Sequence, residues 1–178
     1  NANIALAAER ILFSKTLNAG QICLSPDYIF VKKDEERTLI SELQKAYSKF
    51  FPEPNSDNQT SMVNKHHLKR MNSYLLDATK KGATVESLGK NDDLDKNMIS
   101  TKIVTEVNDG MDVMKHEIFG PVLPIMTYDS ISDVVDYINK NDNPLGLYYF
   151  GRSQSEQNFV INNTRSGGVT VNLSLIHI

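Results

Sequence analysis

With 178 residues, 40% of them hydrophobic and 23% charged, the chain has the length and composition of one soluble globular domain with its own core. Its formal net charge of −3 argues against a surface that follows phosphates, so we expect no nucleic-acid partner. No apolar run approaches about 18 residues, so we expect no membrane span, and the single cysteine cannot form an internal disulfide, which fits a reducing cytoplasm.

The first part of the chain alternates between helical and strand-like patterns. Apolar residues at helical spacing predict a helix over residues 4–17, with Asn3 as its N-cap, and residues 28–33 are typical of a buried strand. Asp34 is the candidate cap of the next helix, which runs to residue 50. The inward face of that helix is expected to carry Leu43, Tyr47 and Phe50.

The middle of the chain holds a second helix and two strands between polar loops. Residues 51–60 hold two prolines and several amides, which indicates a surface loop. A helix is predicted over residues 64–81, and strands over 84–88 and 99–107, with a polar loop between the strands. The apolar residues that we expect this helix to turn inward are Leu68, Met71, Leu75, Leu76 and Ala78.

The last third continues the alternation. Strands are predicted over residues 122–128, 145–150 and 169–172, and helices over residues 131–140 and 156–164. Ser130 is the expected start of the first of these helices, and Ser153 or Ser155 the cap of the second. Alternating strands and helices predict an α/β fold with a mostly parallel sheet flanked by helices.

The only cysteine, Cys23, lies in the run Asn-Ala-Gly-Gln-Ile-Cys-Leu-Ser-Pro-Asp-Tyr at residues 18–28. Gly20 can take positive φ and Pro26 stops a helix, so the thiol sits at a turn between a helix and a strand. Such a thiol is a candidate nucleophile, because loops on a rigid scaffold present side chains to clefts. The alternative is a small buried hydrophobe, since free cysteine is among the most buried residue types.

This run resembles the catalytic-cysteine motif of the aldehyde dehydrogenase family, in its coniferyl aldehyde dehydrogenase-like branch. Three further matches follow in the family's order: Glu-Ile-Phe-Gly-Pro-Val at 117–122, Pro-Leu-Gly-Leu-Tyr-Tyr-Phe-Gly at 144–151 and Ser-Gly-Gly-Val-Thr-Val-Asn at 166–172. The resemblance implies an aldehyde dehydrogenase catalytic domain over residues 1–172, truncated at both ends. Residues 173–178 depart from the family and spell a sequencing-adapter peptide, so we expect a non-native tail there.

The resemblance implies roles for three residues. Cys23 would be the nucleophile that oxidises an aldehyde, aromatic and coniferyl-like in this branch, to the acid through a thiohemiacetal and a thioester. Glu117 would bind the ribose hydroxyls of NAD or NADP, and Phe119 would pack beside the nicotinamide. The alternative for this pair is a surface glutamate and a core phenylalanine. We expect Cys23 to face Glu117 across an open crevice wide enough for a nicotinamide ring.

Other residues have supporting assignments. Asn18 and Gln21 are expected to hold the cysteine loop through side-chain hydrogen bonds, and Gly167 and Gly168 to allow close backbone approach. Asn172 is a candidate for the substrate rim. No metal site is predicted, because the adjacent histidines at 66–67 point about 100° apart on a helix and no spacing resembles a zinc site.

The resemblance places a general-base glutamate and an oxyanion-hole asparagine before Asn1, and a strand for oligomer contacts after the chain's end. We therefore expect the isolated chain to lack a working site, and the full-length protein to be a cytoplasmic homo-oligomer. Two other hypotheses stay open: a CoA-acylating dehydrogenase or thiol esterase that uses the same thioester, and a non-catalytic relic.

Overall fold

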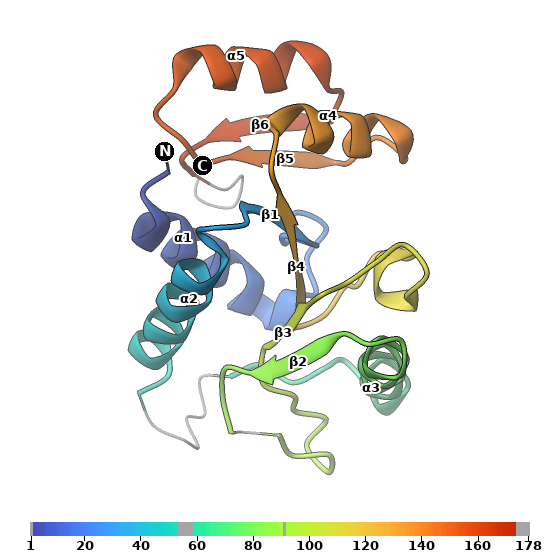
Figure 1. Cartoon of the computed structure of the whole chain (residues 1–178). Coiled ribbons are helices and arrows are strands. Elements are labelled where there is room, and N and C mark those ends of the chain that lie inside the picture. The colour runs from blue at the N-terminus through green and yellow to red at the C-terminus, as the bar shows by residue number, and fades with distance from the viewer. Residues whose placement is uncertain (1, 53–58, 91, 174–178) are drawn as a thin grey trace.

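The computed structural model describes residues 2–52, 59–90 and 92–173, and two sheets organise it (Figure 1). The larger sheet has the strand order β1-β4-β3-β2, in which β1 and β3 run parallel to β4 and β2 is an antiparallel edge strand. The smaller sheet pairs β5 with β6 in parallel. The strands are β1 (Ile29–Lys32), β2 (Thr84–Ser87), β3 (Lys102–Thr105), β4 (Val122–Tyr128), β5 (Gly146–Tyr149) and β6 (Gly168–Val171).

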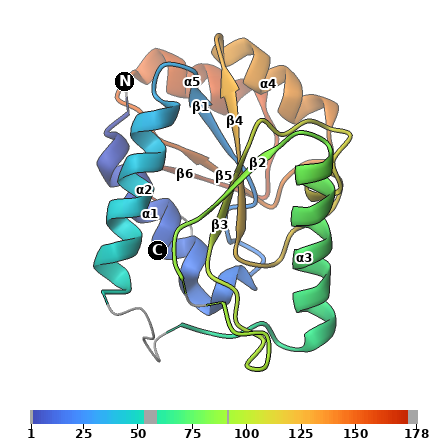
Figure 2. The ribbon, with the colours of Figure 1, turned by 60° about the horizontal axis from the view of Figure 1, so that its bottom comes forward.

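Helices cover both faces of the larger sheet. Figure 2 shows α1 and α2 together on one side of it and α3 on the other. In Figure 1, α4 and α5 lie beside β5 and β6. The helices are α1 (Ile4–Thr16), α2 (Glu36–Phe50), α3 (Lys65–Lys80), α4 (Ile131–Lys140) and α5 (Gln154–Asn163), with 3-10 turns η1 (Leu17–Gly20) and η2 (Asp112–Met114). The α/β fold with a mostly parallel sheet flanked by helices is thus confirmed.

The core follows from the two-residue period of the strands. In β3, Ile103 packs with α1 and α2, while its neighbour Val104 packs with α3. In β4, Leu123 and Ile125 face α1 and α2, and Val122 faces α3. Because successive strand side chains point to opposite faces, strands buried on both sides must be apolar throughout. A third cluster joins α4, α5 and β5 through Val134, Val135, Ile138, Leu147, Tyr149 and Val160.

The predicted helix starts are mostly confirmed. Asn3 Oδ1 accepts a hydrogen bond from the Leu6 N–H at 3.2 Å, and Ser130 and Ser153 likewise cap α4 and α5. Each such cap satisfies a backbone donor that the helix cannot pair itself. The prediction for Asp34 is wrong: α2 begins at Glu36 after Glu35, and no side chain caps it.

Two other predictions need correction. Leu76 does not face inward but is 61% exposed, because it lies off the stripe of α3 on which Leu68, Met71 and Ala78 are buried. The strand expected over residues 99–107 is shorter, since the ladder spans only Lys102–Thr105. Part of the loop predicted at 51–60, and all but one residue of the suspected tail, lie outside the described residues.

No helix in the described part of the chain is both long enough and apolar enough to cross a bilayer.

Candidate active site

Cys23 is exposed and lies within a tight turn between η1 and β1. The turn is closed by a hydrogen bond from the Ser25 N–H to the Ile22 carbonyl, at 2.9 Å. Among the described residues, no group accepts a hydrogen bond from the Cys23 N–H. Because Cys23 is exposed, the hypothesis of a small buried hydrophobe is wrong.

The backbone before the turn is held in a left-handed conformation. Asn18, Ala19 and Gly20 have φ values of 50°, 55° and 71°; glycine adopts this conformation freely and asparagine tolerates it, but alanine is strained there. Asn18 Nδ2 donates to the Gln21 carbonyl at 3.2 Å, and Gln21 Nε2 donates back to the Asn18 carbonyl at 2.9 Å. The predicted role of these two side chains in holding the loop is confirmed.

Gln21 also fastens this loop to the segment that leads into α3. Its Nε2 donates to the Ser61 carbonyl at 3.2 Å, and its Oε1 accepts from the Val63 N–H at 2.8 Å. One amide side chain thus satisfies backbone groups in two distant segments, which fixes the approach of the cysteine loop to α3.

Two side chains tie back the carbonyl groups that follow Cys23. Tyr148 of β5 donates its hydroxyl to the Leu24 carbonyl at 2.7 Å. Lys15 of α1, only 1% exposed, donates Nζ to the Pro26 carbonyl at 2.8 Å. Side chains of α1 and β5 thus hold the backbone that directly follows Cys23.

The segment 117–119 presents two exposed side chains, Glu117 and Phe119, with buried Ile118 between them. Phe119 is 38% exposed and has a φ of 45°, so the alternative of a core phenylalanine is wrong. Within the described chain, no hydrogen bond or ion pair holds the Glu117 carboxylate. A carboxylate without a partner can accept from two hydroxyl groups of a ligand at once.

The backbone of this segment is held from two sides. Arg70 of α3 donates to the carbonyls of Glu117 and Phe119, at 3.2 and 3.4 Å. From the cysteine loop, Asp27 Oδ1 accepts from the Ile118 N–H at 3.0 Å. The loop that carries Cys23 and the segment that carries Glu117 are therefore directly bonded, although the opening expected between their side chains stays a prediction.

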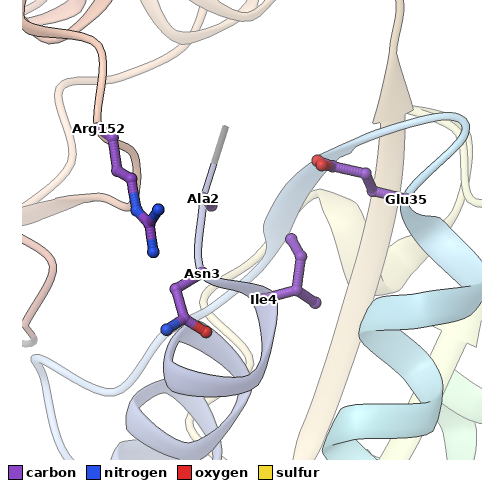
Figure 3. A pocket seen from close by; sticks show the side chains of 5 residues that line it. All are labelled: Ala2, Asn3, Ile4, Glu35 and Arg152. Carbon is purple, nitrogen blue, oxygen red and sulfur yellow. The ribbon is translucent and has the colours of Figure 1, made fainter.

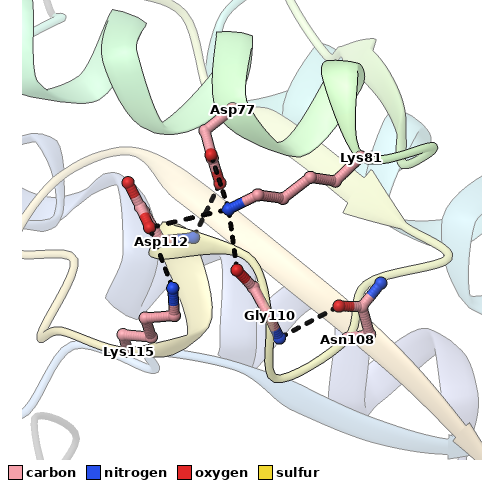
Figure 4. Close-up of polar contacts among 6 residues, drawn as sticks. All are labelled: Asp77, Lys81, Asn108, Gly110, Asp112 and Lys115. Atoms are coloured by element: carbon pink, nitrogen blue, oxygen red, sulfur yellow. Dashed lines mark hydrogen bonds and ion pairs between the residues drawn. The ribbon is translucent and has the colours of Figure 1, made fainter.

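A cluster of charged side chains anchors the chain just before this segment to α3 (Figure 4). Lys81 Nζ lies 2.6 Å from Asp77 Oδ1 and donates to the Gly110 carbonyl at 2.7 Å, while Asp77 Oδ2 accepts from the Asp112 N–H at 2.8 Å. Figure 4 also shows Lys115 beside Asp112. Each exposed pair is worth little alone, but together they fix η2 against α3.

Burial and charge act in opposite directions on Lys15 and Asp27. Burial lowers the pKa of Lys15 to about 8, against the attraction of the negative Asp27 and Glu117. Burial raises the pKa of Asp27, against the charges of Lys15 and Arg70 and the hydrogen bond from Ile118. Lys15 and Asp27 are thus both removed from water, and the attraction between their opposite charges offsets part of the cost.

The remaining predicted residues lie near β5 and β6. A Cβ at Gly167 would lie 2.7 Å from the Leu145 carbonyl oxygen, which confirms close backbone approach there. Asn172, with a φ of 56°, accepts from the Gly151 N–H at 3.0 Å and donates to the Gly151 carbonyl at 3.1 Å. Its side chain therefore holds the turn after β5, and its place at a substrate rim stays a prediction.

No group of three or more His, Cys, Asp or Glu side chains in the described residues could hold a metal ion. One surface hollow lies away from Cys23, around the start of α1, where Ala2, Asn3 and Ile4 pass between Arg152 and Glu35 (Figure 3). The hollow adds no group to the candidate site.

Similarity to known sequences identifies the family of the chain. Residues 1–177 match the aldehyde dehydrogenase family. The chain belongs to the aldehyde dehydrogenase family. It is 40% identical over 182 residues to a probable coniferyl aldehyde dehydrogenase of Caulobacter vibrioides, covering 99% of this chain and 38% of that protein. It is 36% identical to a coniferyl aldehyde dehydrogenase of Pseudomonas sp. strain HR199, again over 38% of its length.

Solved structures of aldehyde dehydrogenases have the same fold. The substrate-bound AldH of Staphylococcus aureus is 35% identical, with a TM-score of 0.92 over 99% of this chain and 38% of that one. A double mutant of S. aureus betaine aldehyde dehydrogenase in complex with NAD+ is 22% identical, with a TM-score of 0.83 over 98% of this chain and 37% of that one, which shows the fold alone. The chain spans about 38% of the length of the aldehyde dehydrogenases that it matches.

Sequence reasoning missed four residues that build the site: Lys15, Asp27, Arg70 and Tyr148. One signal was available, since Lys15 lies three and four positions after the buried Leu12 and Ile11, on the inward face of α1. A lysine there must find a buried partner. The partners of the other three are distant in sequence, and no local pattern indicates them.

Proposed function

We propose that residues 1–172 are the thiol-bearing catalytic domain of an NAD(P)-dependent aldehyde dehydrogenase, with Cys23 as the nucleophile. The observation that supports this most is the bond between Asp27 and Ile118, which joins the loop of the exposed thiol to the segment of Glu117. A nucleophile and a cofactor-binding carboxylate must be near each other for a hydride to pass between substrate and cofactor.

The first step uses groups of this chain alone. The Cys23 thiolate attacks the aldehyde carbon, forming a C–S bond and placing the carbonyl electron pair on an oxyanion. The free N–H of Cys23 is the donor that we assign to this oxyanion, since a preorganised backbone donor stabilises the charge that develops there. Cys23 is exposed, so its sulfur is accessible to a small molecule.

Glu117 and Phe119 fit a nicotinamide nucleotide. The unpartnered carboxylate can accept from both ribose hydroxyls, and the exposed ring offers an apolar face to the nicotinamide end. When bound, that cofactor would accept the hydride, with its electron pair, from the thiohemiacetal carbon. Hydrolysis of the resulting Cys23 thioester returns the thiol and releases the acid.

The 178 residues carry the nucleophile but, we propose, not the whole reaction. The family resemblance places the water-activating glutamate outside them, so we expect no family-like turnover from the chain alone with NAD or NADP. For the substrate, we propose an aromatic aldehyde of the coniferyl type, on the strength of the similarity to two proteins of that name.

The nucleophile can be tested without the rest of an enzyme. Iodoacetamide alkylation of the chain is followed by mass spectrometry, with a synthetic peptide of residues 18–28 as reference and Cys23→Ser as the unlabelled control. An activated Cys23 should react about tenfold faster or more than the peptide. A rate equal to or below that of the peptide would contradict the proposed role.

The substrate class is tested by protection of the same thiol. A reversible thiohemiacetal blocks alkylation, so 3-phenylpropanal is compared with propanal; both lack the conjugated double bond with which coniferyl aldehyde would itself alkylate a thiol. If an aromatic ring is recognised, burying it should lower the half-protecting concentration about tenfold. Equal protection by both aldehydes would count against an aromatic substrate.

A further inference from the structure

Lys15 and Asp27 are charged residues that the proposed chemistry does not use, and they lie where the two halves of the site meet. Lys15 is buried at the end of α1, and Asp27 closes the loop of Cys23 just before β1. We infer that they are positioning residues that act together to fix the turn at residues 22–25 relative to the segment 117–119. This inference rests on the proposed function, because it names what holds that site.

Lys15 acts on the cysteine side. Its Nζ is 2.8 Å from the Pro26 carbonyl, and it forms no ion pair with a described residue. Its charge is attracted by two carboxylates, Asp27 and Glu117, one from each half of the site. A buried ammonium group is stable only where it donates hydrogen bonds and lies near negative charge. The end of α1 and the cysteine loop must therefore keep their relative positions for Lys15 to stay buried.

Asp27 acts on the cofactor side. It is half-buried, and its Oδ1 accepts the Ile118 N–H at 3.0 Å across 91 positions of sequence. The positive charges that face it are Lys15 of α1 and Arg70 of α3. Arg70 in turn donates to the carbonyls of Glu117 and Phe119, so charged side chains hold three backbone groups of the segment, two carbonyls and the Ile118 N–H.

The two residues are coupled through the chain and through charge. Lys15 bonds the carbonyl of Pro26, and that carbonyl belongs to the peptide unit between Pro26 and Asp27. The side chain of Asp27, the next residue, accepts from the Ile118 N–H. Without Lys15, less positive charge offsets the burial of Asp27, so the ionised carboxylate becomes less stable. That ionised form is the one that accepts a strong hydrogen bond from the Ile118 N–H. A substitution at Lys15 should therefore weaken the hydrogen bond of the Ile118 N–H, although Lys15 forms no hydrogen bond with Ile118.

Amide hydrogen exchange on the isotopically labelled chain measures that effect directly. We expect Lys15→Met to speed exchange of the Ile118 N–H about tenfold or more, as for loss of a hydrogen bond to a charged group. The matched control is Lys102→Met. It removes the side-chain charge of another buried lysine, 8% exposed, whose Nζ is bonded to Asp92 and Ser87 and contacts neither the cysteine loop nor the segment 117–119; its backbone bond to Pro121 is kept.

A second variant covers the case in which Lys15→Met fails to fold. Asp27→Asn keeps the size of the side chain and an oxygen that can accept from Ile118, but removes the charge. We expect it to speed Ile118 exchange as well, and the double variant Lys15→Met/Asp27→Asn to change it by less than the product of the single effects, because both disturb one linkage.

Two outcomes would overturn the inference. One is Ile118 exchange in folded Lys15→Met or Asp27→Asn that equals the native rate. The other is an equal acceleration in Lys102→Met, which would indicate a general loss of stability. The test is separable from that of the function: slow alkylation of native Cys23 would contradict the nucleophile, while Ile118 exchange would still report on the linkage.

Discussion

The backbone of Gly20 packs directly on the backbone of Gly120. A Cβ built at Gly20 would overlap the Gly120 carbonyl oxygen and lie 2.8 Å from its carbonyl carbon. Gly20 precedes the turn of Cys23, and Gly120 follows Phe119, so the two halves of the proposed site meet without side chains between them. Glycine is required at residue 20 for two reasons, its φ of 71° and this contact.

Substitution Gly20→Ala should destabilise the chain by about 2–5 kcal/mol, the sum of left-handed strain and overpacking. The matched control is Gly82→Ala, since Gly82 has a φ of 98° but nothing within 4 Å of an added Cβ. It should show the strain alone, about 1–2 kcal/mol. Urea unfolding measures both, and equal losses would contradict the close contact.

Stability should depend on pH through Lys15. Its pKa of about 8 in the folded chain lies below 10.5, so between these values the unfolded chain binds one more proton and the free energy of unfolding rises with pH. The rise is about 3 kcal/mol. It should be seen in urea titrations from pH 8 to 10.5 as a difference between native and Lys15→Met chains.

That comparison removes the contribution of the tyrosines. Burial raises the pKa of Tyr137 and Tyr149 above the usual value near 10. The free energy of unfolding that these two neutral tyrosines contribute is therefore lost as pH rises through their pKa values in the folded chain, and it is lost equally in the native and Lys15→Met chains. A native chain that tracked Lys15→Met across the whole range would contradict a buried, compensated lysine.

Acid should weaken the contact between Asp92 and Lys102. Burial raises the pKa of Asp92, but the hydrogen bonds from Lys102 and Ser100 outweigh it, so the pKa lies below 3.8. Asp92 therefore stabilises the fold above its unfolded pKa, and this contribution is lost as pH falls through the folded value. Because Asp92 is 45% exposed, we expect no more than about 1 kcal/mol.

Unfolding of the native chain and of Asp92→Asn, followed from pH 5 to 2, measures that contribution. The variant should lack the part of the acid dependence that Asp92 carries, so the two curves should converge at low pH. Curves that stay parallel throughout would show that Asp92 is not stabilised by its partners.

Alanine substitutions at a buried and at an exposed leucine of α3 should have very different effects on the free energy of unfolding. Leu68→Ala should destabilise by about 2–5 kcal/mol, because Leu68 is 4% exposed and its loss leaves a cavity. Leu76→Ala, at a side chain 61% exposed, should change stability by less than about 0.5 kcal/mol. Thermal or urea unfolding distinguishes them, and similar losses would contradict the orientation of α3.

Local patterns were sufficient where a single element determines its own structure. The bounds predicted for β4 and α4 are those observed, and Asn3 and Ser130 cap their helices as expected. These features depend on periodicity and on side chains within three residues, so the sequence nearby contains the cause. The same holds for the hydrogen bonds between Asn18 and Gln21.

Predictions failed where the cause lies elsewhere in the chain. Leu76 is apolar and helical, yet the sequence does not say how wide the covered stripe of α3 is, and that width depends on what packs against it. Likewise Arg70 and Asp27 look like ordinary surface charges, although they hold a segment 47 and 91 positions away. Contacts of that range depend on the packing of the whole sheet.

The sequence by itself determined the order and approximate position of the helices and strands, the turn that carries the only thiol, and the family to which the residues point, because short-range patterns encode all of these. Only the tertiary structure decided that Cys23 is exposed rather than buried, that Phe119 is turned outward, and that Lys15 and Asp27 join the two loops. The physical reason is that burial and compensation of charge are properties of a packed interior, which forms only when distant segments meet.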